Sequence, residues 1–205
     1  PQTFVQAAVC VPSRMCAYTG RYPHATRCPW NEVPLPADQK TMGHYFSEAG
    51  YRAALCGKVH YTPDPSTLAA DDPGRLRPVH RVLPGLEDWE FNDGRGAGWL
   101  AHLRRQGYPE EVVKNAFAVQ MPAVSEGRDH SAYPTFFRAE DSDTAFMTDR
   151  AMAFMTDATG DQPWFLHLSY FKPHLPIVAP APYHAMYDPA ASPLPNREAA
   201  ELEHP

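Results

Sequence analysis

The segment PWFLHLSYF, residues 163–171, constrains the fold more than any other part of the sequence. It is apolar and aromatic and is bounded by proline on both sides, a pattern typical of a buried strand. YRAALCG, residues 51–57, indicates a second short buried strand. Both segments are therefore expected to contribute to a central sheet.

Helical patterns alternate with these strands. A proline at the start and a glycine at the end indicate a helix over residues 12–20. Apolar residues at three-to-four spacing predict further helices over 38–49 and 142–159, and residues 98–118 indicate two short ones. The alternation predicts an α/β fold with a mostly parallel central sheet flanked by helices.

Composition limits the remaining possibilities. The 205 residues are 43% hydrophobic, enough to bury the core of one domain. The 23 prolines predict long irregular connections, and residues 62–98 and 120–140 are expected to be loops. A net charge of −6 without a basic run disfavours nucleic acid as a partner. No apolar run approaches the ~20 residues of a membrane span.

The chain begins PQTFVQ, without an initiator methionine or a signal segment. We expect that either a leader was removed or the sequence starts within a longer protein. The compartment cannot be read from this end of the chain.

The stretch AAVCVPSRMCAYTGRYP, residues 7–23, places Cys10 where a helix is expected to begin. A helix N-terminus stabilises a thiolate, and Arg14 lies four residues further along the same helix face. A cysteine phosphatase loop would need arginine at position 16, which is Cys16. Without a C-x-x-C pair, a structural zinc site is not expected. The other cysteines are interpreted as buried thiols, a reading that also remains open for Cys10.

The whole string C-V-P-S-R-M-C-A-Y-T-G-R resembles the sulfatase signature, C-x-P-S-R followed by T-G-R. The resemblance implies that Cys10 is oxidised by a maturation enzyme to formylglycine, which becomes both the catalytic group and a metal ligand. It also implies the alkaline-phosphatase-like fold of that family.

Two further segments fit the sulfatase pattern. Lys58 and His60 follow the strand 51–57, and an extended backbone would point both side chains the same way. His174 follows the strand 163–171, and strand ends are where such sheets bind ligands. Taken alone, these residues would be solvated or structural. The resemblance to the G-K-x-H and P-H segments of the family implies that all three are catalytic. Lys172 is expected to be solvated or to be an additional cation facing the sulfate.

The resemblance can be narrowed to the bacterial phosphonate monoester hydrolases. The segments SDTAFMTDRAMAFM, PWFLHLSYFKPH and APAPYHAMYDP are similar to that branch, as is PWNEVPLP, whose Asn31 would line the substrate site. That branch has tyrosine and threonine where this chain has Lys58 and His60, which are the sulfatase residues. The similarity to this branch slightly favours the cytoplasm as the compartment.

The resemblance also implies a divalent metal, calcium or alternatively manganese or magnesium. In the family an Asp-Asp pair precedes the cysteine segment, and a later aspartate completes the site. Asp71-Asp72 follows Cys10 and has no strand before it, and Asp129-His130 lies in a polar stretch. The other ligands are therefore expected outside this chain. Residues 1–205 are interpreted as one partial sulfatase-type domain that lacks its N-terminal metal-binding strand and its C-terminal part, and that would be poorly stable and inactive alone.

The implied function is hydrolysis of sulfate monoesters. Arg14 and Lys58 would hold negative charge, His174 would protonate the leaving oxygen, and His60 would assist removal of a hydroxyl proton. The expected partners are a small sulfate or phosphonate ester and the formylglycine-generating enzyme, with a homo-oligomer left open. The alternatives are phosphonate monoester or phosphodiester hydrolysis, a non-catalytic anion-binding relative or inactive fragment, and a plain α/β domain with coincidental motifs.

Overall fold

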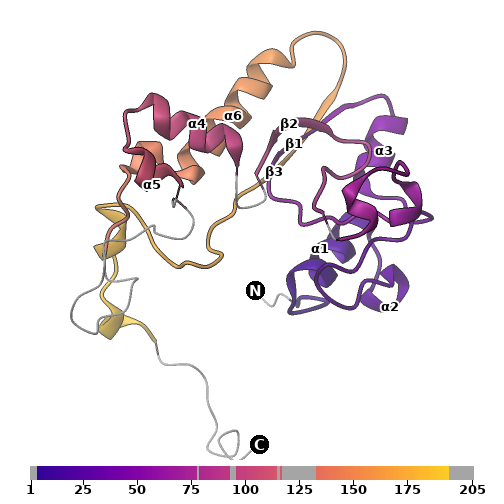
Figure 1. Ribbon diagram of the computed structural model, residues 1–205, viewed down its shortest axis with the longest axis horizontal. Coiled ribbons are helices and arrows are strands. Elements are labelled where there is room, and N and C mark those ends of the chain that lie inside the picture. Colours follow the sequence, from indigo (N-terminus) through magenta and orange to yellow (C-terminus); the bar gives the residue numbers. More distant parts are fainter. Residues whose placement is uncertain (1–3, 78, 93–95, 115, 117–132, 194–205) are drawn as a thin grey trace, which may run out of the picture.

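A computed structural model describes residues 4–77, 79–92, 96–114, 116 and 133–193. Its centre is a parallel three-stranded sheet with helices α1 to α3 on one side and α4 to α6 on the other (Figure 1). The strands are β1 (Arg52–Gly57), β2 (Glu87–Phe91) and β3 (Trp164–Ser169), in the spatial order β2-β1-β3. This confirms the expected α/β class.

The helices differ in length. The α-helices are α1 (Cys10–Thr19), α2 (Pro23–Thr26), α3 (Met42–Glu48), α4 (Ala97–Arg105), α5 (Glu110–Lys114) and α6 (Asp143–Asp157). Short 3₁₀ turns are η1 (Pro65–Thr67), η2 (Pro73–Arg75), η4 (Ala139–Asp141), η5 (Tyr183–Ala185) and η6 (Pro189–Ala191). Every helix predicted from the sequence is present, with ends shifted by a few residues.

Strand β2 corrects one expectation, because it lies inside the segment interpreted as loop. Its sequence EDWEF is acidic, and only Trp89 and Phe91 are large and apolar. It pairs with β1 through Ala54↔Glu87 and Gly57↔Phe91, with a register shift between Leu55 and Cys56. A charged edge strand lacks the apolar run by which β1 and β3 were found.

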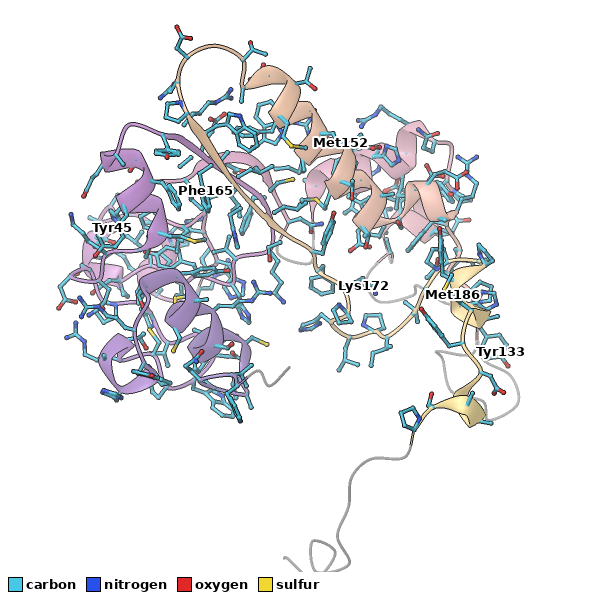
Figure 2. All side chains as sticks on the ribbon, turned by 180° about the vertical axis from the view of Figure 1, so that it is seen from behind. Tyr45, Tyr133, Met152, Phe165, Lys172 and Met186 are labelled. Atoms are coloured by element: carbon cyan, nitrogen blue, oxygen red, sulfur yellow. The ribbon has the colours of Figure 1, made fainter. Side chains whose placement is uncertain are left out.

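Strand β1 divides the core into two clusters, one on each face of the sheet. Leu55 packs with Val11, Met15 and Tyr18 of α1, whereas Cys56 packs with a cluster from α4 and α6. Phe165 of β3 stacks on Phe46 of α3, with ring centroids 3.8 Å apart (Figure 2). Full burial of each such side chain contributes about 1.5–3 kcal/mol. The packing fixes α1 and the sheet relative to each other.

The cysteines divide as the sequence indicated. Cys16, Cys28 and Cys56 are buried free thiols, and Cys10 is half-buried. Burial raises the pKa of Cys56 to about 12 and that of Cys28 to about 11. These two thiols are therefore unreactive near neutral pH. Among the helices within the described ranges, none combines the length and apolarity needed to cross a bilayer.

Candidate active site

Helix α1 begins at Cys10, and a side chain from outside the helix caps it. The N-cap residue Val9 has extended backbone and no capping side chain. Instead, the backbone N–H of Val11 donates to Oδ1 of Asn31 at 3.0 Å. Since the first amides of a helix have no partner within it, Asn31 stabilises this helix start. The structure thus assigns Asn31 a contact beside Cys10, and its role toward substrate stays a prediction.

Arg14 lies across the carboxyl ends of two strands. Its Nη1 donates to the Tyr18 hydroxyl at 3.1 Å, to the Lys58 carbonyl at 3.2 Å and to Ser169 Oγ at 3.2 Å. Lys58 directly follows β1, and Ser169 ends β3. The Arg14 charge also lowers the pKa of His167, whose main perturbation is burial. The guanidinium therefore sits at the strand ends, where open α/β sheets bind ligands.

Lys58 is 5% exposed, so the alternative interpretation of Lys58 as a merely solvated residue does not hold. The backbone N–H of Lys58 donates to the Ser169 carbonyl at 2.8 Å. Its side-chain Nζ lies 4.7 Å from the centroid of the Phe171 ring. Gly57 makes this approach possible, because its φ is +116° and an added Cβ would come within 2.0 Å of the Ser169 oxygen. The ring face attracts an ammonium that has lost most of its water.

His174 lies at the exposed tip of the segment after β3. The backbone N–H of His174 donates to the Phe171 carbonyl at 3.1 Å. The His174 ring packs on the Phe171 ring, with centroids 4.7 Å apart. Its Nδ1 lies 2.8 Å from the Leu175 carbonyl oxygen. A carbonyl only accepts hydrogen bonds, so Nδ1 is the donor in this contact and Nε2 is the ring nitrogen that faces away from it.

His60 departs from the sequence expectation. Its φ is +57°, so the extended backbone expected to align the Lys58 and His60 side chains is absent at this residue. The His60 ring instead packs against His80, with centroids 4.5 Å apart and planes at 65°. The two-residue spacing rule holds only for extended backbone, and it could not predict a left-handed residue three positions after the end of β1.

Of the two alternatives expected for Lys172, full solvation does not hold because the side chain is half-buried, and the role of an additional cation stays a prediction. Its Nζ donates to the Pro176 carbonyl at 2.7 Å, which closes the loop around His174. Burial lowers the pKa of Lys172, and the nearby Asp143 carboxylate opposes that shift. Asp143 is the first residue of α6, and it is 3% exposed. Figure 2 shows Lys172 just beyond the end of β3.

A cavity of about 900 Å³ is lined by residues of this loop and of the start of α6. Lys172 and Asp143 contribute polar groups to it, and Ile177 and Val178 contribute apolar surface. The described residues that line it do not include Cys10, Arg14 or Lys58. The cavity is therefore not the place where the predicted site residues gather.

A sulfatase family model matches residues 1–201. The chain belongs to the sulfatase family. The contacts above connect Arg14 to Lys58 and, through Phe171, Lys58 to His174, while Asn31 contacts Val11, the residue after Cys10.

Two curated relatives are similar to most of this chain. The sulfatase-family chain is 34% identical over 205 residues to a multifunctional alkaline phosphatase superfamily protein, PehA, from Trinickia caryophylli. It is 25% identical over 194 residues to a choline-sulfatase from Rhizobium meliloti (strain 1021). The first alignment covers 96% of this chain and 38% of the relative, and the second covers 90% and 33%. The chain thus spans little more than a third of the length of these relatives.

Two solved structures share the fold closely. A phosphonate monoester hydrolase from Silicibacter pomeroyi superposes with a TM-score of 0.81 at 36% identity, over 93% of this chain and 37% of that one. A phosphonate monoester hydrolase from Agrobacterium radiobacter gives a TM-score of 0.83 at 28% identity, over 96% and 38%. The resemblance to the phosphonate monoester hydrolase branch is confirmed.

The described residues of this sulfatase-family chain do not fit a complete divalent metal site. Within the described ranges, no three His, Cys, Asp or Glu side chains gather closely enough to hold an ion. Asp72 accepts hydrogen bonds from Gly74 N at 2.7 Å and from Arg81 at 3.1 Å, as expected of a turn residue. Asp129-His130 falls outside the described residues. Cys10 can supply one ligand at most, and ligands from outside this chain stay a prediction.

Sequence reasoning missed the residues that connect the site. Ser169 and Tyr18 hold the Arg14 guanidinium, and Phe171 contacts both Lys58 and His174. Tyr18 was recognisable only as one residue of the signature string, and Ser169 and Phe171 only as part of an apolar strand. The change from apolar residues to Ser169 at the end of that strand could have marked Ser169 alone.

Proposed function

We propose that the complete protein containing this chain hydrolyses sulfate monoesters, using a formylglycine made from Cys10. The observation that carries the proposal is the position of Arg14, one helical turn beyond Cys10, against the Lys58 carbonyl at the strand ends. Two cations and a modifiable cysteine at this edge suit an anionic ester.

Arg14 and Lys58 would bind the sulfate oxygens. The contacts of Arg14 Nη1 are with uncharged oxygens, so its positive charge remains available to an anion. Lys58 is buried, and a cation in a water-poor site attracts an anion more strongly than one in bulk water. Both groups are held before substrate arrives, so they need little reorganisation during the reaction.

His174 would transfer the proton to the leaving oxygen. Its Nδ1 is committed to the Leu175 carbonyl, so Nε2 is the atom that delivers the proton. His60 would assist removal of a hydroxyl proton, a role that rests on the family pattern. Formylglycine, in its hydrated form, would supply the attacking hydroxyl, and a divalent metal bound with ligands from outside this chain would complete the site. The partners proposed are the ester substrate and the formylglycine-generating enzyme.

A second candidate is hydrolysis of phosphonate monoesters or phosphodiesters. It is favoured by the structural match to two phosphonate monoester hydrolases at TM-scores of 0.81 and 0.83. Lys58 and His60, which replace the tyrosine and threonine expected in that branch, favour sulfate. The intact C-V-P-S-R string argues against a non-catalytic relative, since an anion-binding module needs no oxidisable cysteine there.

The test uses the complete protein, co-expressed with a formylglycine-generating enzyme. kcat/KM is compared for an aryl sulfate and the matching aryl phosphonate monoester, with Cys10→Ala as the blank. We expect a preference for sulfate and no turnover by the Ala variant. A preference for phosphonate would establish the second candidate, and normal turnover by Cys10→Ala would remove both.

A further inference from the structure

The Phe171 ring contacts two residues of the proposed site. Lys58 Nζ lies over the ring at 4.7 Å from its centroid, and the His174 ring lies at the same centroid distance with the planes at 40°. The Phe171 carbonyl also accepts the His174 N–H at 3.1 Å. Phe171 lies two residues beyond β3, so strand pairing fixes the backbone close to it.

The Phe171 ring is one contact that positions the Lys58 ammonium. The Lys58 backbone is held at both ends, since its N–H donates to Ser169 and its carbonyl accepts from Arg14. The long side chain still has rotatable bonds, and at 5% exposure it cannot reach bulk water freely. The ring face is the attractive surface to which a desolvated cation orients.

The same ring restricts His174, which is otherwise exposed. The bond from Nδ1 to the Leu175 carbonyl fixes one edge of the imidazole. Contact with Phe171 fixes the tilt of the imidazole plane, and together these two contacts aim Nε2. The loop itself is held by Lys172, whose Nζ donates to the Pro176 carbonyl close to the buried Asp143.

We propose that Phe171 is a positioning residue that fixes the Lys58 ammonium and the His174 imidazole relative to each other for hydrolysis. The inference rests on the proposed function, because it takes His174 as the proton donor to the leaving oxygen. The role proposed for Phe171 needs no direct contact of the ring with the reacting atoms. It acts through two groups whose positions become linked, because both rest on one ring.

The leaving group makes this role measurable. A phenyl ester needs proton donation more than a 4-nitrophenyl ester does, because nitrophenolate leaves readily without a proton. Phe171→Leu removes the ring while keeping an apolar side chain, and Phe171→Tyr keeps the ring as the matched control. A filler of the apolar core would tolerate leucine, whereas a positioning ring would not.

The experiment measures kcat and KM of the complete, matured protein and both variants on the phenyl and 4-nitrophenyl esters of the acid that the wild type hydrolyses. For Phe171→Leu we expect kcat to fall about tenfold on the phenyl ester and about twofold on the 4-nitrophenyl ester. Phe171→Tyr should stay within about twofold of wild type on both. Wild-type kcat for Phe171→Leu on both esters would overturn the proposal.

A spectroscopic readout is independent of activity. An aromatic ring in contact with an imidazole shifts the histidine ring-proton resonances, and comparison with His174→Ala assigns those of His174. We expect these resonances to move in Phe171→Leu and to stay near wild type in Phe171→Tyr. Unmoved resonances in Phe171→Leu would overturn the proposal even if the wild type hydrolyses neither ester, a result that would itself remove the proposed function. If the leucine variant does not fold, Phe171→Met replaces it with the same expectations.

Discussion

Arg14 and Asp141 are two charged residues with three polar partners each, and they lie on opposite sides of the sheet. Arg14 Nη1 faces a hydroxyl, a carbonyl and a second hydroxyl, all uncharged. Within the described ranges, no carboxylate lies within ion-pair distance of it. Asp141 is 2% exposed and lies just before α6, in the α4–α6 half of the molecule.

The partners of Asp141 balance its charge. Its carboxylate accepts from Tyr108 at 2.8 Å and Arg138 at 2.7 Å, and it lies 3.1 Å from His102 Nε2. Burial alone would raise the pKa of Asp141, but the hydrogen bonds from these three residues hold it below its ordinary value. The Asp141 charge, balanced in this way, is expected to act within the fold. The Arg14 charge, surrounded by neutral acceptors, can instead attract an anionic ligand.

The largest expected effect is on stability and comes from Asp141. Asp141→Ala removes three hydrogen bonds to an ionised group, so we expect the free energy of unfolding to fall by about 3–4 kcal/mol. Urea denaturation of the complete protein measures the change. Activity per folded molecule should stay at the wild-type value. A loss of activity without a loss of stability would show that Asp141 acts in the reaction and not in the fold.

Arg14 should show the opposite behaviour. Because Arg14→Met removes the positive charge that is proposed to bind the anionic ester, we expect kcat/KM to fall about 100- to 1000-fold. The loss of unfolding free energy should be about 1 kcal/mol, since the lost partners are neutral. Kinetics and urea denaturation on the same preparation separate the two quantities. A variant that keeps its activity but unfolds readily would show that Arg14 is structural.

Acid should reveal the charge on Asp141. Its folded-state pKa lies below its unfolded value of about 3.9, so the stabilisation is complete above about pH 5. It is then lost as pH falls through the folded-state pKa, because the unfolded state binds the proton first. The difference in unfolding free energy between wild type and Asp141→Asn should therefore shrink from pH 7 to pH 3. A difference that stays constant over this range would show that the carboxylate charge is not involved.

Asn31 gives the smallest effect and separates two roles. Asn31→Ala removes the cap from α1 and should cost about 1 kcal/mol of unfolding free energy. Asn31→Asp keeps the acceptor oxygen and should retain stability, yet it places a negative charge beside Cys10 and should raise KM for an anionic ester. Thermal denaturation and kinetics of both variants test this, and a wild-type KM in a stable Asn31→Asp variant would mean that capping is the whole role of Asn31.

Local patterns predicted the parts of the fold that local physics determines. The apolar segments gave β1 and β3, and the apolar stripe gave α6. Strand β2 was missed because its residues are charged and its partner β1 lies about thirty residues earlier in the chain. Pairing of that kind depends on tertiary contacts, which outweigh intrinsic strand preference.

The sequence predicted which residues belong to the candidate site, but it did not predict the contacts between them. Motif resemblance indicated Cys10, Arg14, Lys58 and His174, and contacts in the structure connect Arg14 to Lys58 and Lys58, through Phe171, to His174. The cap that Asn31 provides spans twenty residues, and the ring contacts of Phe171 join separate segments. Such contacts depend on how distant segments pack together, and the spacing of residues along the sequence does not predict that packing.

The two edges of the sheet differ in how they are protected from other strands. Strand β2 carries Glu87, Asp88 and Glu90, whereas WFLHLS of β3 carries no acidic or basic residue other than a histidine. Within the described residues β3 pairs with β1 alone, and its Trp164 is 41% exposed. An uncharged apolar edge is a template for intermolecular strand addition. We therefore expect an intermolecular strand to add at β3 more readily than at the acidic edge strand β2.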